Sequence, residues 1–364
     1  MQNKYINYII KNGINLQKNQ IVEIVGSSYL TNFISNLKSA CLEHGASSVY
    51  VKYIDGAALQ QKINLDYNLY IEEEIKKYKE LITNGFSRII IQSPFLIPMT
   101  LNEDKKDIYE SCQRQLAFVK DYFLNNEASK TICLASNPYW AAKLRKSEEE
   151  LWDDIYKYTF MDNELDNVLV YLNNLNIKTL HFKNSLGTNL ILDLTNDFEF
   201  QGRNQYTKNN IKYQPNIPSL ELYTAPNKYS LNGVVYSTKP LYYYGNVIDD
   251  WFIKFKNGKI VESKGLASII SLDPNLSYAG EIALCEAFDN INYYSTLLNE
   301  NTSAHLALGM AYEYGIKDKT NINTCGYHID LSFGSADLEV TAITKEFRSV
   351  TIMENGKFIY EKKN

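Results

Sequence analysis

The stretch that decides the fold of the N-terminal part reads QIVEIVG at residues 20–26. It is a short apolar, β-branched run that ends at a glycine, which is typical of a strand buried in a parallel sheet. Helical and strand-like patterns alternate after it. We predict helices over residues 29–43, 65–83 and 102–125, and strands over residues 48–54, 88–91 and 131–135. Strands separated by helices of this length predict a mostly parallel sheet that helices cover on both faces.

The turn after the first strand, Gly26-Ser27-Ser28, lies where open α/β sheets often bind ligands. It has neither the glycine spacing of a dinucleotide site nor the lysine of a P-loop. We therefore interpret it as a packing turn.

The pattern changes in the second half of the chain. A capping box at Ser147 to Glu150 opens an amphipathic helix, and we place the domain boundary just before it, giving domains 1–145 and 146–364. Short strands then follow, with two Asn-Gly hairpins over residues 251–261 and 353–360. The expected fold is α/β: an N-terminal, mostly parallel α/β domain followed by an α+β domain with an antiparallel sheet.

The composition is that of an ordinary globular protein. The 364 residues are 45% hydrophobic and 22% charged, with a net charge of −5. No basic run suggests nucleic acid or a membrane surface as a partner, and no apolar stretch approaches the roughly 20 residues that span a bilayer. The five cysteines form no CxxC pair, and the N-terminus lacks a signal-peptide pattern. We expect reduced thiols and a cytoplasmic location.

Two of the four histidines fall in the C-terminal part, within NENTSAHLALG at residues 299–309 and HID at residues 328–330. His328 and Asp330 point the same way if they lie on a strand, because side chains alternate between faces. Glu221 and Glu281 each lie inside an apolar stretch, and a carboxylate is rarely buried without a partner or a metal. These residues are therefore candidate metal ligands together with His305. From spacing alone, ordinary roles stay open: edge or surface glutamates and a hydrogen-bonded histidine.

The motifs resemble a known family when they are taken in order. ELYTAP at 221–226, GEIAL at 280–284, ENTSAHLALG at 300–309 and HID at 328–330 resemble the metalloaminopeptidase family of aminopeptidase T and aminopeptidase S, the thermophilic-type leucyl aminopeptidases. The resemblance extends upstream to NPYWAAK at 137–143 and to Gly187-Thr188, so it covers nearly the whole chain.

The resemblance implies a dinuclear metal centre. Its ligands would be Glu221, Glu281, His305, His328 and Asp330. Three carboxylates and two imidazoles suit two divalent ions of zinc, cobalt or manganese. The family match further implies an aminopeptidase that cleaves short peptides with a free N-terminus, and a homodimer that encloses its sites.

The same match assigns two catalytic roles. One glutamate would bridge the ions or take the proton of the attacking water, and we favour Glu281. Tyr312 matches a family tyrosine seven residues after the motif histidine, and it would donate to the developing oxyanion. Seven residues are nearly two helical turns, so we expect His305 and Tyr312 to share a helix face.

The chain departs from the family pattern at residues that flank the site. Leu220 replaces a Gly or Glu, and Leu331-Ser332-Phe333 replaces Phe-Met-Ile. Asn299 and Thr302 replace an Asp and an Ala. None of these changes removes a ligand, but they leave the substrate preference and the level of activity open.

Two other functions are compatible with parts of this pattern. Scaffolds resembling this family also support iron(II) ring-cleaving dioxygenases, for which His305, His328 and Asp330 would suffice as a two-histidine, one-carboxylate triad. Such an enzyme needs neither Glu221 nor Glu281, so their presence favours the peptidase. A non-catalytic relative that only binds peptides is the third possibility, and the five filled ligand positions argue against it.

Overall fold

The computed structural model describes residues 1–54, 67–96, 114–243 and 246–360. The chain divides into two compact units. Unit 1 comprises Met1–Met161 and Asn204–Pro218, and unit 2 comprises Asp162–Arg203 and Ser219–Asn364. The predicted division into domains after residue 145 stays a prediction.

Unit 1 is built on a five-stranded sheet in the order β2-β1-β3-β4-β9, with all neighbouring strands parallel. Its strands are β1 (Ile21–Gly26), β2 (Ser48–Tyr53), β3 (Phe86–Gln92), β4 (Lys130–Leu134) and β9 (Asn216–Ile217). Val22 and Ile24 of β1 are fully buried, as expected for a strand inside a parallel sheet. The predicted parallel sheet is confirmed.

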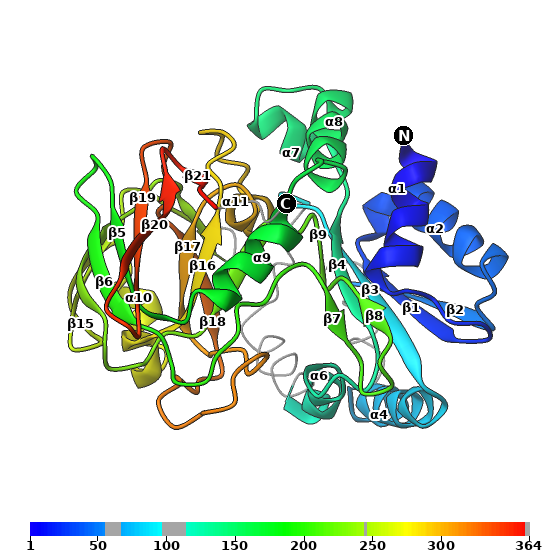
Figure 1. Cartoon of the computed structure of the whole chain (residues 1–364). Helices are drawn as coiled ribbons and strands as arrows, with labels where there is room; N and C mark the ends of the chain where they lie inside the picture. The colour runs from blue at the N-terminus through cyan, green and yellow to red at the C-terminus, as the bar shows by residue number, and fades with distance from the viewer. Residues whose placement is uncertain (55–66, 97–113, 244–245, 361–364) are drawn as a thin grey trace. The chain divides into compact units, whose positions relative to one another are not determined.

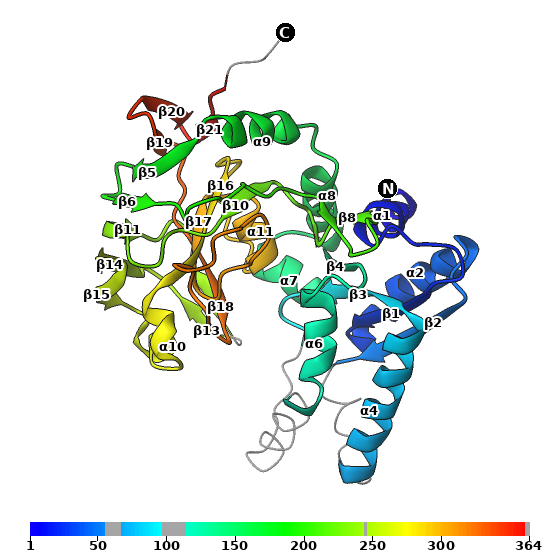
Figure 2. The same ribbon diagram turned by 60° about the horizontal axis from the view of Figure 1, so that its bottom comes forward.

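Helices cover both faces of this sheet, as right-handed crossovers require when the strand order reverses after β2. They are α1 (Gln2–Tyr8), α2 (Thr31–Glu43), α4 (Tyr67–Asn84), α6 (Ala117–Leu124), α7 (Pro138–Lys143) and α8 (Glu148–Thr159). The α1 and α2 helices lie on one face and α4 and α6 on the other (Figures 1 and 2). The capping box of Ser147 and Glu150 starts α8 as predicted. Of the helix predicted over residues 102–125, the part up to residue 113 lies outside the described residues.

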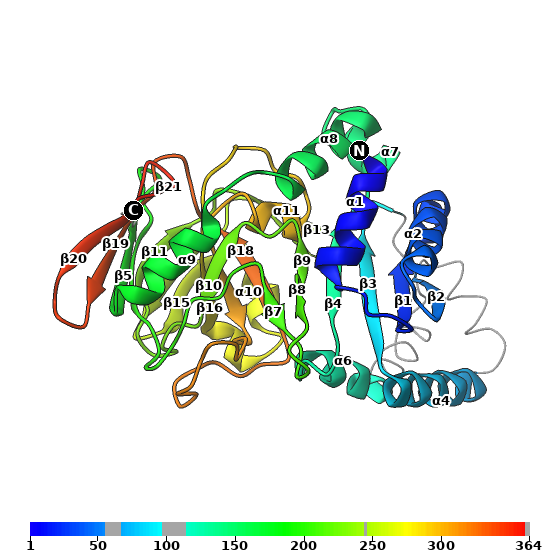
Figure 3. The ribbon, with the colours of Figure 1, turned by 45° about the vertical axis from the view of Figure 1, so that its right-hand side comes forward.

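Unit 2 contains two larger antiparallel sheets (Figure 3). The eight-stranded sheet has the order β15-β14-β11-β6-β5-β19-β20-β21, with strands β5 (Ile177–Lys183), β6 (Asn189–Asp193), β11 (Asn232–Tyr236), β14 (Phe252–Lys256), β15 (Lys259–Lys264), β19 (Glu339–Thr344), β20 (Ser349–Glu354) and β21 (Lys357–Phe358). The four-stranded sheet has the order β10-β16-β17-β18, with strands β10 (Glu221–Thr224), β16 (Ala279–Cys285), β17 (His305–Gly309) and β18 (His328–Ser332).

Several smaller elements complete the two units. Unit 1 also has the helical turns Ile9–Gly13 and Ser28–Leu30 and the strands β7 (Gln205–Tyr206) and β8 (Lys212–Tyr213). Unit 2 also has the helices α9 (Leu165–Asn174), α10 (Ala267–Ile270) and α11 (Thr296–Glu300), the helical turn Pro274–Ser277, and the strands β12 (Leu241–Tyr243) and β13 (Asn246–Ile248).

Both predicted hairpins of unit 2 are present. Asn257 and Gly258, between β14 and β15, have φ angles of 51° and 78°, and Asn355 and Gly356, between β20 and β21, have 51° and 68°. Two consecutive residues with positive φ are what a type I′ turn requires, and Asn-Gly adopts them at low cost. The predicted α+β part with antiparallel sheets is therefore confirmed.

One hydrophobic core lies between the two large sheets of unit 2. It includes Phe182 and Leu190 of the eight-stranded sheet and Leu284 and Leu306 of the four-stranded sheet, all fully buried. The core thus occupies one face of the four-stranded sheet, and the residues on the other face do not belong to it. No helix among the described residues is long and apolar enough to cross a membrane.

Candidate metal centre

The strand register places all five predicted ligands on one face of the four-stranded sheet. Asp330 and Glu281 pair with Ala307 from opposite sides, so these three residues share a face. His305 and His328 are two residues from Ala307 and Asp330 along their strands and point the same way. Glu221 pairs with Cys285, which follows Glu281 by four residues. The pleat therefore gathers five residues that are up to 109 positions apart in the sequence.

The opposite face of the same sheet belongs to the hydrophobic core. It carries Leu222, Ile282, Leu284, Leu306, Leu308, Ile329 and Leu331. On the ligand face, Ala307 lies between Glu281 and Asp330, and Ala283 lies between Tyr223 and His305. These alanines leave the space above the sheet to the longer side chains.

The distances between the ligand atoms fit bound metal ions. Nε2 of His305 lies 3.1 Å from Oε2 of Glu221 and 3.5 Å from Oε1 of Glu281. Nε2 of His328 lies 3.2 Å from Oδ1 of Asp330 and 3.9 Å from the same Oε1 of Glu281. Ligand bonds of roughly 2.1 Å place neighbouring donor atoms about 3.0–3.4 Å apart in tetrahedral or octahedral geometry. The side chains present therefore suit a divalent ion without large rearrangement.

Hydrogen bonds fix which imidazole nitrogen faces the cluster. Nδ1 of His328 is 2.7 Å from the carbonyl oxygen of Met310, and Nδ1 of His305 is 3.3 Å from that of Ser303. A carbonyl oxygen only accepts, so each Nδ1 carries the proton and donates it. Each neutral ring then presents the lone pair of Nε2 to a carboxylate oxygen. Backbone partners of this kind orient metal-binding histidines in proteins.

The contacts of Glu221 indicate that its carboxylate requires a proton or a metal ion beside it. Its Oε2 is buried and has no well-aligned hydrogen-bond donor among the described residues, although Nε2 of His305 is only 3.1 Å away. Two lone pairs at this distance repel each other unless a proton or a metal ion lies between them. Burial raises the pKa of Glu221, and the neighbouring imidazole of His305 opposes this rise.

The protonation of the histidines follows from the surrounding carboxylates. Burial by itself lowers the pKa of His328, but the charge of Asp330 and the hydrogen bond to it outweigh burial and raise the pKa to about 9. Burial likewise opposes the charged form of His305, whose pKa the hydrogen bonds to Glu221 and Glu281 raise well above the usual value. Without a metal, protons occupy the positions between imidazole and carboxylate.

A sixth residue, Glu300, belongs to the cluster and was not among the predicted ligands. It ends α11 and is 9% exposed, and its carboxylate lies within 4.8 Å of ligand atoms of His305 and Asp330. Burial and the charge of Asp330 raise its pKa well above the usual value. The sequence signal for this residue is its position as an acid inside the motif ENTSAHLALG, five residues before His305.

Three overlapping groups of donor atoms result: Glu221, Glu281 and His305; Glu281, His328 and Asp330; and Glu300, His305 and Asp330. Glu281 is shared by the first two. None of the four carboxylates forms an ion pair with a lysine or arginine among the described residues. Four carboxylates in one buried cluster need positive charge, which either protonated imidazoles or metal ions supply.

The predicted helix through His305 and Tyr312 is wrong. His305 begins strand β17, and Tyr312 lies in the irregular segment after that strand. A seven-residue spacing matches two helical turns, but the residues after His305, LALG, are apolar without interruption, which a fully buried strand satisfies equally well. Tyr312 still lies beside the cluster: its ring centroid is 4.5 Å from that of His328. Burial and the charge of Glu281 raise its pKa, so its hydroxyl keeps its proton.

The departures from the family pattern separate into two kinds. Leu331 and Phe333 point into the hydrophobic core, away from the ligands. Leu220 is held through its backbone, whose N–H donates to Oδ1 of the fully buried Asn301. Ser332, in contrast, pairs with His305 on the ligand face.

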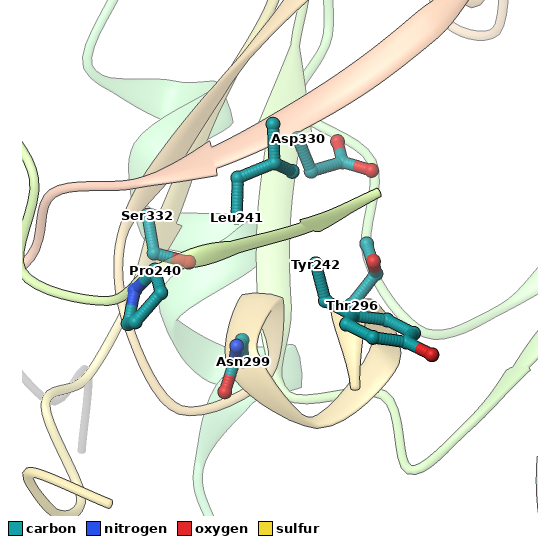
Figure 4. Close-up of a pocket in the computed structure, with 7 residues that line it drawn as sticks. All are labelled: Pro240, Leu241, Tyr242, Thr296, Asn299, Asp330 and Ser332. Atoms are coloured by element: carbon teal, nitrogen blue, oxygen red, sulfur yellow. The ribbon is translucent and has the colours of Figure 1, made fainter. Parts of the chain in front are cut away.

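A pocket adjoins the cluster on this face. It is lined by Pro240, Leu241, Tyr242, Thr296, Asn299, Asp330 and Ser332 (Figure 4). Asp330 is thus common to the pocket and to two of the donor groups.

Comparisons with known proteins show which proteins the chain is similar to. The chain is 29% identical to aminopeptidase AmpS of Bacillus subtilis, with 98% of each chain covered. Its fold matches the structure of wild-type AmpT from Thermus thermophilus with a TM-score of 0.86 at 22% identity, over 99% of both chains. It also matches 2,5-dihydroxypyridine dioxygenase of Pseudomonas putida, with a TM-score of 0.53 at 12% identity, over 99% of this chain and 97% of the other. At these identities the two structures show the fold alone.

A family model settles the resemblance that the motifs suggested. The model of the thermophilic metalloproteases, peptidase family M29, matches residues 1–358. The donor cluster of the four-stranded sheet lies within this match. The chain therefore belongs to the M29 family of metallopeptidases.

Proposed function

We propose that the protein is a dinuclear metal-dependent aminopeptidase that removes N-terminal residues from short peptides. The observation that carries this proposal is the position of Glu281, whose Oε1 lies within 4 Å of Nε2 of both His305 and His328. Two donor groups that share one carboxylate are what a pair of ions bridged by that carboxylate requires. Glu281 would help to hold both ions, with Glu221 and His305 as the other ligands of one and His328 and Asp330 as those of the other.

We add Glu300 to this ligand set. Four carboxylates carry four negative charges, which two divalent ions balance. When bound, such ions polarise a carbonyl group and supply a water nucleophile near neutral pH. The sheet face holds five of the six side chains, α11 supplies Glu300, and backbone hydrogen bonds also orient His305 and His328.

The other groups of the site are then assigned to the substrate. Tyr312 keeps its proton and lies against His328, so we propose that it donates to the carbonyl oxygen as negative charge develops there. Such a donor contributes about 3 kcal/mol to the stabilisation of the transition state. The similarity to aminopeptidases supports a substrate with a free N-terminal amine. We further propose that the enzyme works in the cytoplasm as a homodimer.

Metal content and activity test this function together. Protein reconstituted with Co²⁺ or Mn²⁺ should hold about two ions per chain by elemental analysis. Hydrolysis of leucyl anilides should disappear with a chelator and return with either metal. A single bound iron per chain, with ring-cleaving activity, would contradict the proposal in favour of a dioxygenase. Peptide binding without hydrolysis at full metal occupancy would favour the non-catalytic alternative.

A variant pair makes the test specific to the bridge. Glu281→Gln should lose metal from both positions, and activity should fall by more than about 100-fold, since even outer-sphere partners of metal ligands contribute about 10- to 100-fold. Glu262→Gln is the matched control, because Glu262 is exposed on β15 and forms an ion pair with Lys254. It should keep both ions and full activity.

A further inference from the structure

The segment between β17 and β18, residues 310–327, contains none of the proposed ligands but carries two groups that lie against one of them. Met310 begins the segment, and its carbonyl oxygen accepts the hydrogen bond from Nδ1 of His328 at 2.7 Å. Tyr312 follows two residues later and lies against the ring of His328. The segment forms neither helix nor strand apart from an isolated bridge at Ile316. No ladder of helix or strand hydrogen bonds therefore fixes the position of its backbone.

Asn323 holds the start of this segment with two hydrogen bonds. Its Nδ2 donates to the carbonyl oxygen of Gly309 at 2.7 Å, and its backbone carbonyl oxygen accepts from the N–H of Ala311 at 2.9 Å. These two bonds lie on either side of Met310. The carbonyl group of Met310, which orients His328, is therefore held from both sides by one residue.

The side chain of Asn323 also joins this segment to the turn before β16. Its Nδ2 donates to the carbonyl oxygens of Asn275 at 2.8 Å and of Tyr278 at 3.1 Å. Tyr278 directly precedes β16, and its carbonyl oxygen also accepts from the N–H of Gly309 at 3.0 Å. The amide thus connects the start of β16, the end of β17 and the segment that carries Tyr312.

The orientation of this amide group follows from its surroundings. Asn323 is 1% exposed, and the three carbonyl oxygens around Nδ2 can only accept hydrogen bonds. Reversing the amide would place a fourth oxygen against them. Oδ1 is also buried, and it finds no hydrogen-bond donor among the described residues. A buried acceptor without a partner is costly, so stability alone does not explain this residue.

We propose that Asn323 is a positioning residue of the metal centre: it fixes the carbonyl group that orients His328, and it places Tyr312 beside that imidazole. Asn323 acts through these two residues rather than on the metal or the substrate. The part of the inference that concerns His328 depends only on the contacts of this imidazole. The part that concerns Tyr312 rests on the proposed aminopeptidase function.

Removal of the amide should weaken one metal position more than the other. In Asn323→Ala, the ion on the side of His328 should bind about 10-fold or more weakly, because partners that orient a metal-binding histidine contribute about 10- to 100-fold to affinity. The ion on the side of His305 should keep its affinity, since Nδ1 of that imidazole faces the carbonyl oxygen of Ser303 instead. Co²⁺ is titrated into metal-free protein, and its visible spectrum reports both positions. Equal weakening of the two positions would overturn the inference.

A measurement without metal separates this inference from the proposed function. The chain has four histidines, so protein labelled with ¹⁵N-histidine gives few imidazole signals, and His328→Asn identifies those of His328. In Asn323→Ala the Nδ1–H signal of His328 should broaden through exchange with water, while that of His305 stays unchanged. An unchanged His328 signal would show the inference to be wrong even if the protein is an aminopeptidase. If the signal broadens but no peptide is hydrolysed, the proposed function fails and the positioning of His328 by Asn323 stands.

A double-mutant cycle at saturating metal tests the role towards Tyr312. Asn323→Ala should lower kcat for leucyl anilide by about 10-fold or more with little change in KM, since small displacements of catalytic groups already have effects of this size. In the Tyr312→Phe background the same substitution should change kcat little, because the hydroxyl through which it acts is already absent. Full additivity of the two effects would contradict the assignment to Tyr312.

Two further variants separate positioning from misfolding. Asn323→Ser retains one hydroxyl donor and should show the same selective effects, at smaller size, if Asn323→Ala does not fold. Asn232→Ala is the matched control, because the side chain of Asn232 also bonds two backbone groups, the carbonyl of Ser230 and the N–H of Asn257. It lies on the eight-stranded sheet and should leave both metal affinities, the His328 signal and kcat unchanged. Equal losses in Asn232→Ala and Asn323→Ala would assign the effect to general stability and overturn the inference.

Discussion

Metal binding to the donor cluster should release at least two protons per chain at pH 7. In the metal-free protein, Nε2 of His305 and Nε2 of His328 each face a carboxylate oxygen at 3.1 Å and 3.2 Å. The pKa of His328 is raised to about 9, and that of His305 lies well above its usual value. A group with a pKa of about 9 is roughly 99% protonated at pH 7. Each ion must therefore displace a proton before its imidazole can bind it.

The pH dependence of the metal affinity follows from the number of protons released. Release of one proton per ion makes each apparent dissociation constant fall about 10-fold, and the product of the two about 100-fold, for each pH unit between 7 and 8. The raised pKa of Glu300 adds to the released protons, so two is the lower value. Above the pKa of His328 the dependence should become weaker, because that imidazole is then already neutral.

Calorimetry measures directly how many protons are released when the metal binds. Zinc is titrated into metal-free protein at pH 7 in buffers with different enthalpies of ionisation, and the slope of observed heat against buffer enthalpy gives the protons released. His328→Asn should lower the number by about one. His181→Asn should not change it, because His181 lies outside the cluster and bonds Asn189. Release of less than one proton by the wild type would refute this account of the metal-free site.

Three further outcomes are expected. Tyr312→Phe should lower kcat by about 100-fold with unchanged metal content, as expected for loss of an oxyanion donor worth about 3 kcal/mol; loss of metal would show a structural role instead. The metal-free protein should lose about 3 kcal/mol of stability in denaturant unfolding as the pH rises through 9, because the folded pKa of His328 lies above the unfolded value and its contribution is complete only below about 6.5. In unit 1, Arg88→Met should destabilise by about 3–5 kcal/mol, because it leaves the fully buried Glu23, 2.6 Å away, without its cation. The exposed pair of Lys208 and Glu127 is the control, and Lys208→Met should cost less than about 1 kcal/mol.

Local patterns predicted much of the fold. Residues 20–26 indicated a buried parallel strand because a strand covered on both faces is apolar without interruption, and β1 is such a strand. Asn257-Gly258 indicated a hairpin because the type I′ turn needs positive φ at both positions. These signals act within a few residues, so the sequence carries them in full.

The parts of the site that local patterns missed depend on distant partners. The strand containing His305 is buried on both sides, by the core and by the cluster, so its sequence shows no alternation that distinguishes a strand from a helix. Glu300 reaches the cluster because α11 contacts β18, and nothing near Glu300 in the sequence indicates that packing. His328 and Asp330, in contrast, belong to one strand, and their spacing of two residues predicted their common direction correctly.

A single glycine explains how β16 serves both the core and the metal cluster. In a regular strand Ala279 and Glu281 would point the same way, yet Ala279 packs in the hydrophobic core and Glu281 faces the donor atoms. The register shifts between these two residues, which is a β-bulge at Gly280. A Cβ atom at Gly280 would lie 2.3 Å from the carbonyl oxygen of Gly309, so no other residue fits. The bulge turns Glu281 over while Ile282 and Leu284 return to the core, and the glycine of the GEIAL motif thereby determines where its glutamate points.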